Sequence, residues 1–247
     1  MAFETDRGAY SRPYSVGQAG AAEIDAGLRR YMLQVYNYMA SGLFLSGLVA
    51  MLVANTGARS LFFQATERGY GPTGLGWLSI LAPIGIILAM SFGASRMKAS
   101  TLKVLYWAFV ATMGVGLSNA LLMYTGVSVT RVFFITATAF GSLSLYGYLT
   151  KRDLSAFGTF LFMGLIGLMI AGIVQMFVHS AALQFVYSAV GVLLFSGMTA
   201  YDTQRIKNNY LQMGGTDHSA IMGAVAIYLD FINLFQFLLQ FMGVRRD

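Results

Sequence analysis

The stretch that decides the fold is SAIMGAVAIYLDFINLFQFLLQFM, residues 219–242. As a helix it would extend for about 36 Å, enough to cross the roughly 30 Å hydrocarbon core of a bilayer. Its only ionisable carboxyl is that of Asp230, which lies near the middle, about 16–18 Å from the end. An ionisable group at this depth is costly and is usually functional. The stretch therefore predicts a transmembrane helix with a functional carboxyl group at its centre.

Six further apolar runs precede this one, and each is long enough to span a bilayer. They cover residues 31–54, 74–94, 102–124, 127–149, 155–178 and 181–203. An outer-membrane barrel would instead show segments of about ten residues with alternating hydrophobicity. We therefore predict an all-α integral membrane protein whose residues 29–247 form a bundle of seven transmembrane helices.

The N-terminal residues 1–28 are polar and mixed in charge, and they lack the apolar region of a signal peptide. We expect a flexible cytoplasmic tail with a short interfacial helix near residues 21–30.

The overall composition agrees with a membrane protein. The 247 residues are 57% hydrophobic and 11% charged, whereas a typical soluble domain is about 25% charged. There is no cysteine, which excludes disulfides and thiolate metal sites. The net charge is +6, but the basic residues lie in short loops and form no basic face with interleaved aromatics. Nucleic acid is therefore not an expected partner, and we expect no tightly bound cofactor.

The distribution of Lys and Arg predicts the orientation. Of the 16 basic residues, 11 lie in the N-terminal tail and in the loops 95–103, 150–154 and 204–218, on one side of the bundle. The positive-inside rule then places the N-terminus in the cytoplasm and the C-terminus outside. Arg245 and Arg246 follow the last span directly and would favour the cytoplasm. A re-entrant last segment, with both termini cytoplasmic, therefore stays open as an alternative.

A second aspartate, Asp202, lies at the end of the sixth span. Asp202 and Asp230 are each 14 residues from Thr216, in the GGTD turn of residues 214–217. If the last two spans form an antiparallel hairpin that closes there, the two carboxyl groups face each other. This arrangement requires the sixth helix to continue past Asp202 to about Tyr210.

Each aspartate also lies on a polar helix face. The periodicity of an α-helix places Gln184, Ser188, Gly191 and Thr199 on the face of Asp202, and Asn233, Gln236 and Gln240 on the face of Asp230. A helix that faces lipid would not carry such a face. We therefore expect the last helix to be central and enclosed by the other six, with Ser188, Thr199, Asn233 and Gln236 along a polar pore.

Two buried carboxylates in contact cannot both ionise cheaply, so the pair titrates as a unit. With one proton it is a hydrogen bond between two helices, and with none it is a repelling pair of hard oxygen ligands that suits Ca²⁺. Two plainer interpretations stay open. Asp202 can form a local ion pair with Arg205 at i+3, and a protonated Asp230 can form a hydrogen bond that only packs helices.

Two motifs make the sequence recognisable: GMTAYDTQ at residues 197–204 and AIYLDFINLF at residues 226–235. With them the chain resembles the Bax inhibitor-1 family, the transmembrane Bax inhibitor motif proteins, over about residues 28–243. The resemblance implies seven helices with the last enclosed by six, and a calcium leak whose pH sensor is the pair Asp202 and Asp230. Some family members add an arginine in the second helix, for which Arg96 is the candidate here. The resemblance also implies a bacterial member in the inner membrane.

These residues bear on three possible functions. The leading hypothesis is a pH-sensitive cation leak that carries Ca²⁺ and responds to protons. The alternative is a non-conducting modulator of a membrane-bound AAA protease or of other membrane partners. Intramembrane proteolysis is not expected, because Asp230 follows Ile227-Tyr228-Leu229 and not the Gly-x-Gly that admits a substrate backbone in such proteases. We therefore expect no enzymatic activity.

Overall fold

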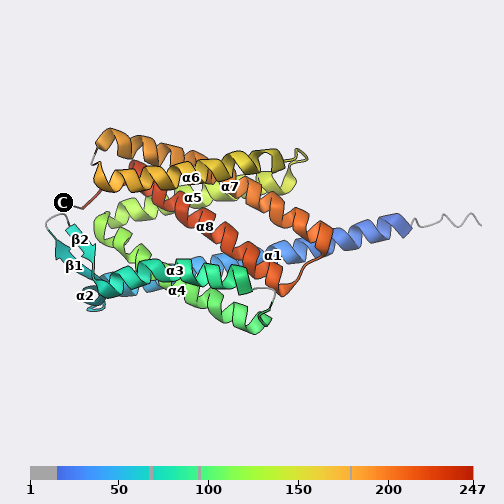
Figure 1. Cartoon of the computed structure of the whole chain (residues 1–247). Helices are drawn as coiled ribbons and strands as arrows, with labels where there is room; N and C mark the ends of the chain where they lie inside the picture. Colours follow the sequence, from blue (N-terminus) through green and yellow to red (C-terminus); the bar gives the residue numbers. More distant parts are fainter. Residues whose placement is uncertain (1–15, 67–68, 94–95, 179, 247) are drawn as a thin grey trace, which may run out of the picture.

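The computed structural model describes residues 16–66, 69–93, 96–178 and 180–246. Over these residues the chain forms eight helices and one two-stranded hairpin (Figure 1). The elements are α1 (Val16–Asn55), α2 (Arg59–Phe62), β1 (Phe63–Thr66), β2 (Gly69–Pro72), α3 (Gly74–Gly93), α4 (Ala99–Met123), α5 (Gly126–Leu149), α6 (Ser155–Phe177), α7 (Ala181–Met213) and α8 (Asp217–Met242).

Seven of the helices are long and apolar enough to cross a membrane, which confirms the predicted fold class. Five of them begin and end within about three residues of the predicted spans. The two exceptions are longer. Helix α7 continues to Met213, as the hairpin hypothesis required. Helix α1 begins at Val16, so the short helix expected near residues 21–30 is continuous with the first span. Residues 1–15 lie outside the described part.

The connection between the first two spans contains a hairpin that the sequence did not predict. Strand β1 pairs antiparallel with β2, with Phe63 opposite Pro72. Phe63 is buried and packs in a small cluster with Val53 of α1 and Leu122 of α4. The hairpin therefore covers the end of α1 and α4, at the end of the bundle where the C-terminus lies (Figure 1).

Helix α8 is the centre of the bundle. In its most apolar stretch 72% of the residues are buried, against 11–28% in the other six spans. It packs mainly against α1, α4, α5 and α7, whereas α3 packs on α4 and α6 packs on α7. The central position predicted from the polar face is thus confirmed, and the direct neighbours are four helices with two more outside them.

The two ends of α8 are fixed in different ways. At the N-terminus, Thr216 and Ser219 form a reciprocal capping box after a turn in which Gly214 adopts a positive φ of 74°, a conformation that favours glycine. Past the C-terminus, the Val244 N–H donates to Ser128 Oγ (2.9 Å) and Arg246 Nε donates to the Tyr124 carbonyl (3.0 Å). The helix runs uninterrupted between these ends, and its 26 residues are long and apolar enough to cross a membrane.

Candidate functional site

The structure brings Asp202 of α7 and Asp230 of α8 together. Their carboxyl groups lie close enough to interact directly. Both side chains lie inside the bundle, with 5% of Asp202 and 1% of Asp230 exposed. The contact follows from the long α7 and the turn at residues 214–216, which place the two aspartates opposite each other across the hairpin.

The hydrogen bonding of the pair is incomplete. Asp202 Oδ1 and Asp230 Oδ2 are buried and accept no hydrogen bond from an N–H or O–H among the described residues. The nearest cation is Arg205, whose Nη1 lies 3.4 Å from Asp202 Oδ1 in an i,i+3 ion pair and whose side chain is half exposed. A carboxylate can only accept, so a hydrogen bond between two carboxyl groups requires a proton on one of them.

Close packing of α5 holds the first aspartate in place. A Cβ atom added at Gly147 would collide with the carbonyl oxygen of Ala200, so only glycine allows the two backbones this approach. Next to Asp202, Thr203 Oγ1 donates to Ser144 Oγ (3.3 Å) and to the Thr199 carbonyl (2.8 Å). These contacts fix the face of α7 that carries Asp202 against α5.

Gln204, the last residue of the first motif, fixes the loop between α5 and α6. Its side-chain oxygen accepts from the Leu154 N–H (2.8 Å) and its amide donates to the Arg152 carbonyl (2.8 Å). The side chain is buried. Gln204 thus satisfies backbone groups that would otherwise be left without partners beside the bundle.

The second aspartate is held by its neighbours on α8. The Tyr228 hydroxyl lies 2.6 Å from Ser46 Oγ of α1. The Phe231 ring packs edge-on against Phe140 of α5, with centroids 5.4 Å apart. Asp230, between these two anchors, is therefore tied to both sides of the bundle.

The predicted polar pore is not continuous in the structure. Ser188 and Thr199 are fully buried, and their hydroxyls donate to the carbonyls of Gln184 and Phe195 in the preceding turn of α7 (both 2.7 Å). The Asn233 amide likewise donates to the Leu229 carbonyl (2.8 Å). Side chains satisfied by their own helix need no water or ion beside them, so these three residues do not line an open path.

Gln236 has a different environment. It lines a polar pocket of about 270 Å³ near the C-terminal end of α8, together with Asn119, Gln184, Gln240 and Arg245. Asn119 of α4 was not among the predicted site residues, and its Oδ1 is buried without a hydrogen-bond partner in the described part of the chain. The polar face of α8 thus leads from the aspartate pair to this pocket.

An aromatic plug separates the pocket from the aspartates. Phe237 of α8 packs against Gly191, where an added Cβ would collide with the ring, and stacks on Phe195 with centroids 5.6 Å apart. Gly191 and Phe195 lie between Gln184 and Asp202 along α7. The space between α7 and α8 is therefore filled by apolar side chains at the level of Phe237.

Arg96, the predicted charge partner, does not reach the pair. It is exposed in the turn after α3, and within the described residues no ion pair joins it to an aspartate. The carbonyl oxygen of the next residue, Met97, lies 2.8 Å from His218 Nε2 at the start of α8. That position is about 18 Å along the helix from Asp230. Arg205 is therefore the cation that is paired with the site, and the prediction that Arg96 is its charge partner is wrong.

The pair alone is a small ligand set for a metal. Among the described residues there is no cluster of three or more His, Cys, Asp or Glu side chains that could hold a metal ion. Ca²⁺ takes six to eight oxygen ligands. A Ca²⁺ ion at Asp202 and Asp230 would therefore need carbonyl or water oxygens for the rest of its shell.

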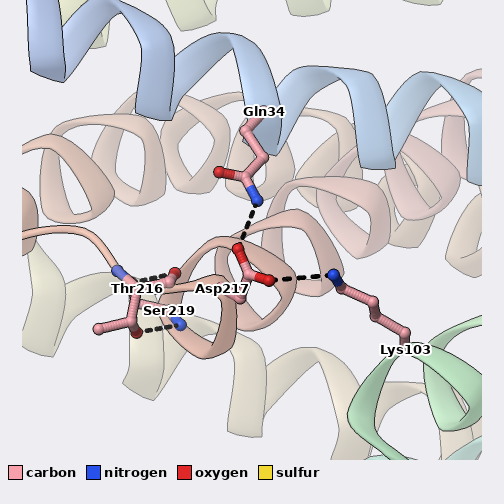
Figure 2. Close-up of polar contacts among 5 residues, drawn as sticks. All are labelled: Gln34, Lys103, Thr216, Asp217 and Ser219. Carbon is pink, nitrogen blue, oxygen red and sulfur yellow. Dashed lines mark hydrogen bonds and ion pairs between the residues drawn. The ribbon is translucent and has the colours of Figure 1, made fainter. Parts of the chain in front are cut away.

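The second carboxyl group of α8, that of Asp217, provides a contrast (Figure 2). Asp217 Oδ1 accepts from Gln34 Nε2 of α1 (3.1 Å), and Oδ2 accepts from Lys103 Nζ of α4 (3.0 Å). Figure 2 shows Asp217 between these two helices, beside the Thr216–Ser219 cap. This carboxylate is satisfied and partly exposed at the helix N-terminus.

Fold and site together define a class: a multi-pass all-α membrane protein with a buried carboxyl pair between its last two spans. Sequence comparison then gives the family. Residues 28–247 match the family described as inhibitor of apoptosis-promoting Bax1, and the chain belongs to this Bax inhibitor-1 family.

The relatives are similar over nearly their whole length. The chain is 46% identical to an uncharacterized protein of Caulobacter vibrioides, over 96% of this chain and 97% of the relative. It is 45% identical to the uncharacterized protein RP147 of Rickettsia prowazekii, over 90% and 93%. It is 42% identical to the inner membrane protein YbhL of Escherichia coli, over 90% and 94%. The likeness thus extends over nearly the whole length of these bacterial relatives, of which YbhL is an inner membrane protein.

Proposed function

We propose that this protein is a pH-sensitive leak channel for Ca²⁺ or a similar cation, gated by Asp202 and Asp230. The observation that carries the proposal is the close approach of two buried carboxyl groups. Among the described residues, Asp202 Oδ1 and Asp230 Oδ2 accept no hydrogen bond, and the cation beside them is Arg205, ion-paired with Asp202. The family resemblance supports the same function. Both aspartates act as the sensor, and neither is catalytic.

The proposed gate depends on one proton. When one carboxyl group carries this proton, it donates a hydrogen bond to the other, and the bond holds α7 against α8. Without the proton, two negative charges lie in contact inside the bundle, where water screens them poorly. The charge acting on both groups is that of Arg205, which is ion-paired with Asp202. A balance between two conformations needs only a few kcal/mol to shift, so repulsion within the pair is a sufficient drive.

Separation of α7 from α8 would also release the plug. Phe237 is held between Gly191 and Phe195, both of α7. Movement of α7 therefore changes the contact that separates the polar pocket at Gln236 from the aspartates. Hydrophobic constrictions of this kind gate channels by excluding water. The ionised carboxyls would then offer hard oxygen ligands to a passing Ca²⁺ ion.

The relation to Escherichia coli YbhL, an inner membrane protein, and the distribution of basic residues support a location in a bacterial inner membrane with the N-terminus in the cytoplasm. We further propose that the protein has no enzymatic activity and no tightly bound cofactor.

The test is Ca²⁺ flux into liposomes that contain the purified protein and a Ca²⁺-sensitive dye, measured over a pH series. The wild-type flux should depend on pH. Asp202→Asn and Asp230→Asn keep the size of each side chain but cannot titrate, so each should flatten that dependence, and the double variant should add little because the pair acts as a unit.

Asp217→Asn is the matched control, since it removes a carboxyl group from the same helix away from the pair. It should keep the wild-type pH profile. If both single variants at the pair leak Ca²⁺ with unchanged pH dependence, the shared-proton gate is wrong. If the wild type conducts at no pH, the result favours the alternative, a non-conducting modulator of a membrane-bound protease.

A further inference from the structure

A groove runs between α1 and α5 on the outside of the bundle. The two helices pack on α7 and α8 and not closely on each other, which leaves a space of about 470 Å³ between them. Its walls include Arg29, Leu33 and Tyr36 of α1 and Phe140, Gly141 and Leu145 of α5. Leu33 and Leu145 are more than half exposed, so in a membrane the groove opens toward lipid.

The groove has one charged end. Arg29 lies at that end and is exposed, and Tyr148 lines the groove near the end of α5. Interfacial tyrosines and arginines lie at the level of the lipid headgroups. From Arg29 the lining continues through Leu33 and Gly141, which offer only apolar surface. A phospholipid with an anionic headgroup is complementary to this groove, because its negative charge would lie at Arg29 and its acyl chain along the apolar part.

We propose that this groove binds one anionic phospholipid, with its phosphate at Arg29 and one acyl chain along Leu33, Gly141 and Leu145. Arginine recognises phosphate through charge-assisted hydrogen bonds. There is open space for the chain beside Gly141, because a Cβ atom built at this position would have no neighbouring atom within 4 Å.

The bound lipid would touch the wall that supports the aspartate pair. Phe140 packs on Phe231, the residue after Asp230. Ser144, also in the groove, accepts a hydrogen bond from Thr203, the residue after Asp202. The lipid site is thus one side chain away from both helices of the pair, although its existence does not depend on conduction.

The natural chain has no cysteine, so a single introduced cysteine carries a fluorophore at one known place. Leu145→Cys puts the probe on the rim of the groove, and Leu33→Cys puts it on the opposite rim. Met169→Cys, on the exposed face of α6, is the control position. Each labelled protein is placed in phosphatidylcholine liposomes with increasing brominated phosphatidylglycerol or, in parallel, brominated phosphatidylcholine, and quenching is measured.

At both rim positions brominated phosphatidylglycerol should bind roughly fivefold more strongly than brominated phosphatidylcholine, the effect of one basic residue near an anionic lipid. At Met169→Cys the two lipids should quench equally. Arg29→Gln should bring the ratio at the rim close to one. Arg30→Gln, which removes an adjacent exposed arginine outside the groove, should leave the preference intact.

A filled groove gives an independent readout. Gly141→Leu should lower quenching by both lipids at Leu33→Cys, whereas Gly167→Leu, at an exposed α6 glycine that is also free of neighbours, should not. Equal quenching by the two lipids at both rim positions would overturn the proposal. So would an equal loss of preference in Arg29→Gln and Arg30→Gln, which would indicate a general basic surface and no site.

Discussion

Asp217 and Asp230 are carboxyl groups of the same helix, yet their surroundings are opposite. The Asp217 side chain is 48% exposed and accepts hydrogen bonds from Lys103 and Gln34. Asp230 is 1% exposed, its carboxyl group lies beside that of Asp202, and in the described part its Oδ2 accepts no hydrogen bond. The first group completes a helix end, where negative charge is favoured. The second lies where a charge is costly, and it lacks the hydrogen-bond donors that would stabilise a buried carboxylate.

The difference indicates which of the two carboxyl groups is held for a function. A structural carboxylate gains from donors and a nearby cation, and Asp217 has both. A buried acid that selection kept only for packing could be replaced by an apolar residue at little cost. Asp230 lies opposite Asp202, an arrangement whose properties change with a single proton. Each of the following experiments tests one part of this contrast.

The largest expected effect is all-or-none and concerns the ends of α8. The contrast assumes that Asp217 lies at the cytoplasmic end and that the far end of the helix faces outside. In the cysteine-free chain, Met213→Cys and Val244→Cys place exposed thiols at the two ends. In spheroplasts an impermeant maleimide should label Val244→Cys alone, and Met213→Cys should react only after the membrane is opened. The reverse pattern would overturn the orientation inferred from the basic residues.

The second effect is on stability and separates Asp230 from a packing residue. Asp230→Ala removes the partner of Asp202 and leaves a buried polar group unpaired, which should lower the free energy of unfolding by about 1–3 kcal/mol. Asp230→Asn can still donate a hydrogen bond to Asp202 and should stay within about 0.5 kcal/mol of the wild type. Unfolding in detergent at neutral pH measures both. Equal stability of the alanine variant and the wild type would mean that the pair is not bonded.

Much of this fold could be predicted from the sequence because each prediction rested on a long-range regularity. The seven apolar runs fix the spans, since lipid allows few other structures. The equal distance of Asp202 and Asp230 from Thr216 fixes their contact, because a hairpin of two rigid helices transmits register over many residues. The polar face of α8 fixes its central position for the same reason.

The predictions for single side chains were wrong where the role of a residue depends on which neighbours the fold brings to it. Arg96 is close to the end of α3, but the chain alone does not say that this turn lies beside His218 and not beside Asp230. Ser188 and Thr199 lie on the expected face, yet their hydroxyls bond to their own helix and line no path. The polar pocket needs Asn119 from α4, a partner that only the packed structure brings to Gln236.

The smallest expected effect is at Asp217, and it completes the contrast. Lys103 and Asp217 are both partly exposed, so water screens their attraction. A double-mutant cycle with Lys103→Gln and Asp217→Asn should give a coupling energy of about 0.2–1 kcal/mol, measured by unfolding in detergent. Because the Debye length falls to about 3 Å at 1 M salt, the coupling should shrink there. The same cycle with Asp202→Asn and Asp230→Asn should change little with salt, since ions cannot approach a pair inside the bundle. A coupling at Asp217 that is large and insensitive to salt would mean that this helix end is as enclosed as the centre, and the distinction between the two carboxyl groups would then be lost.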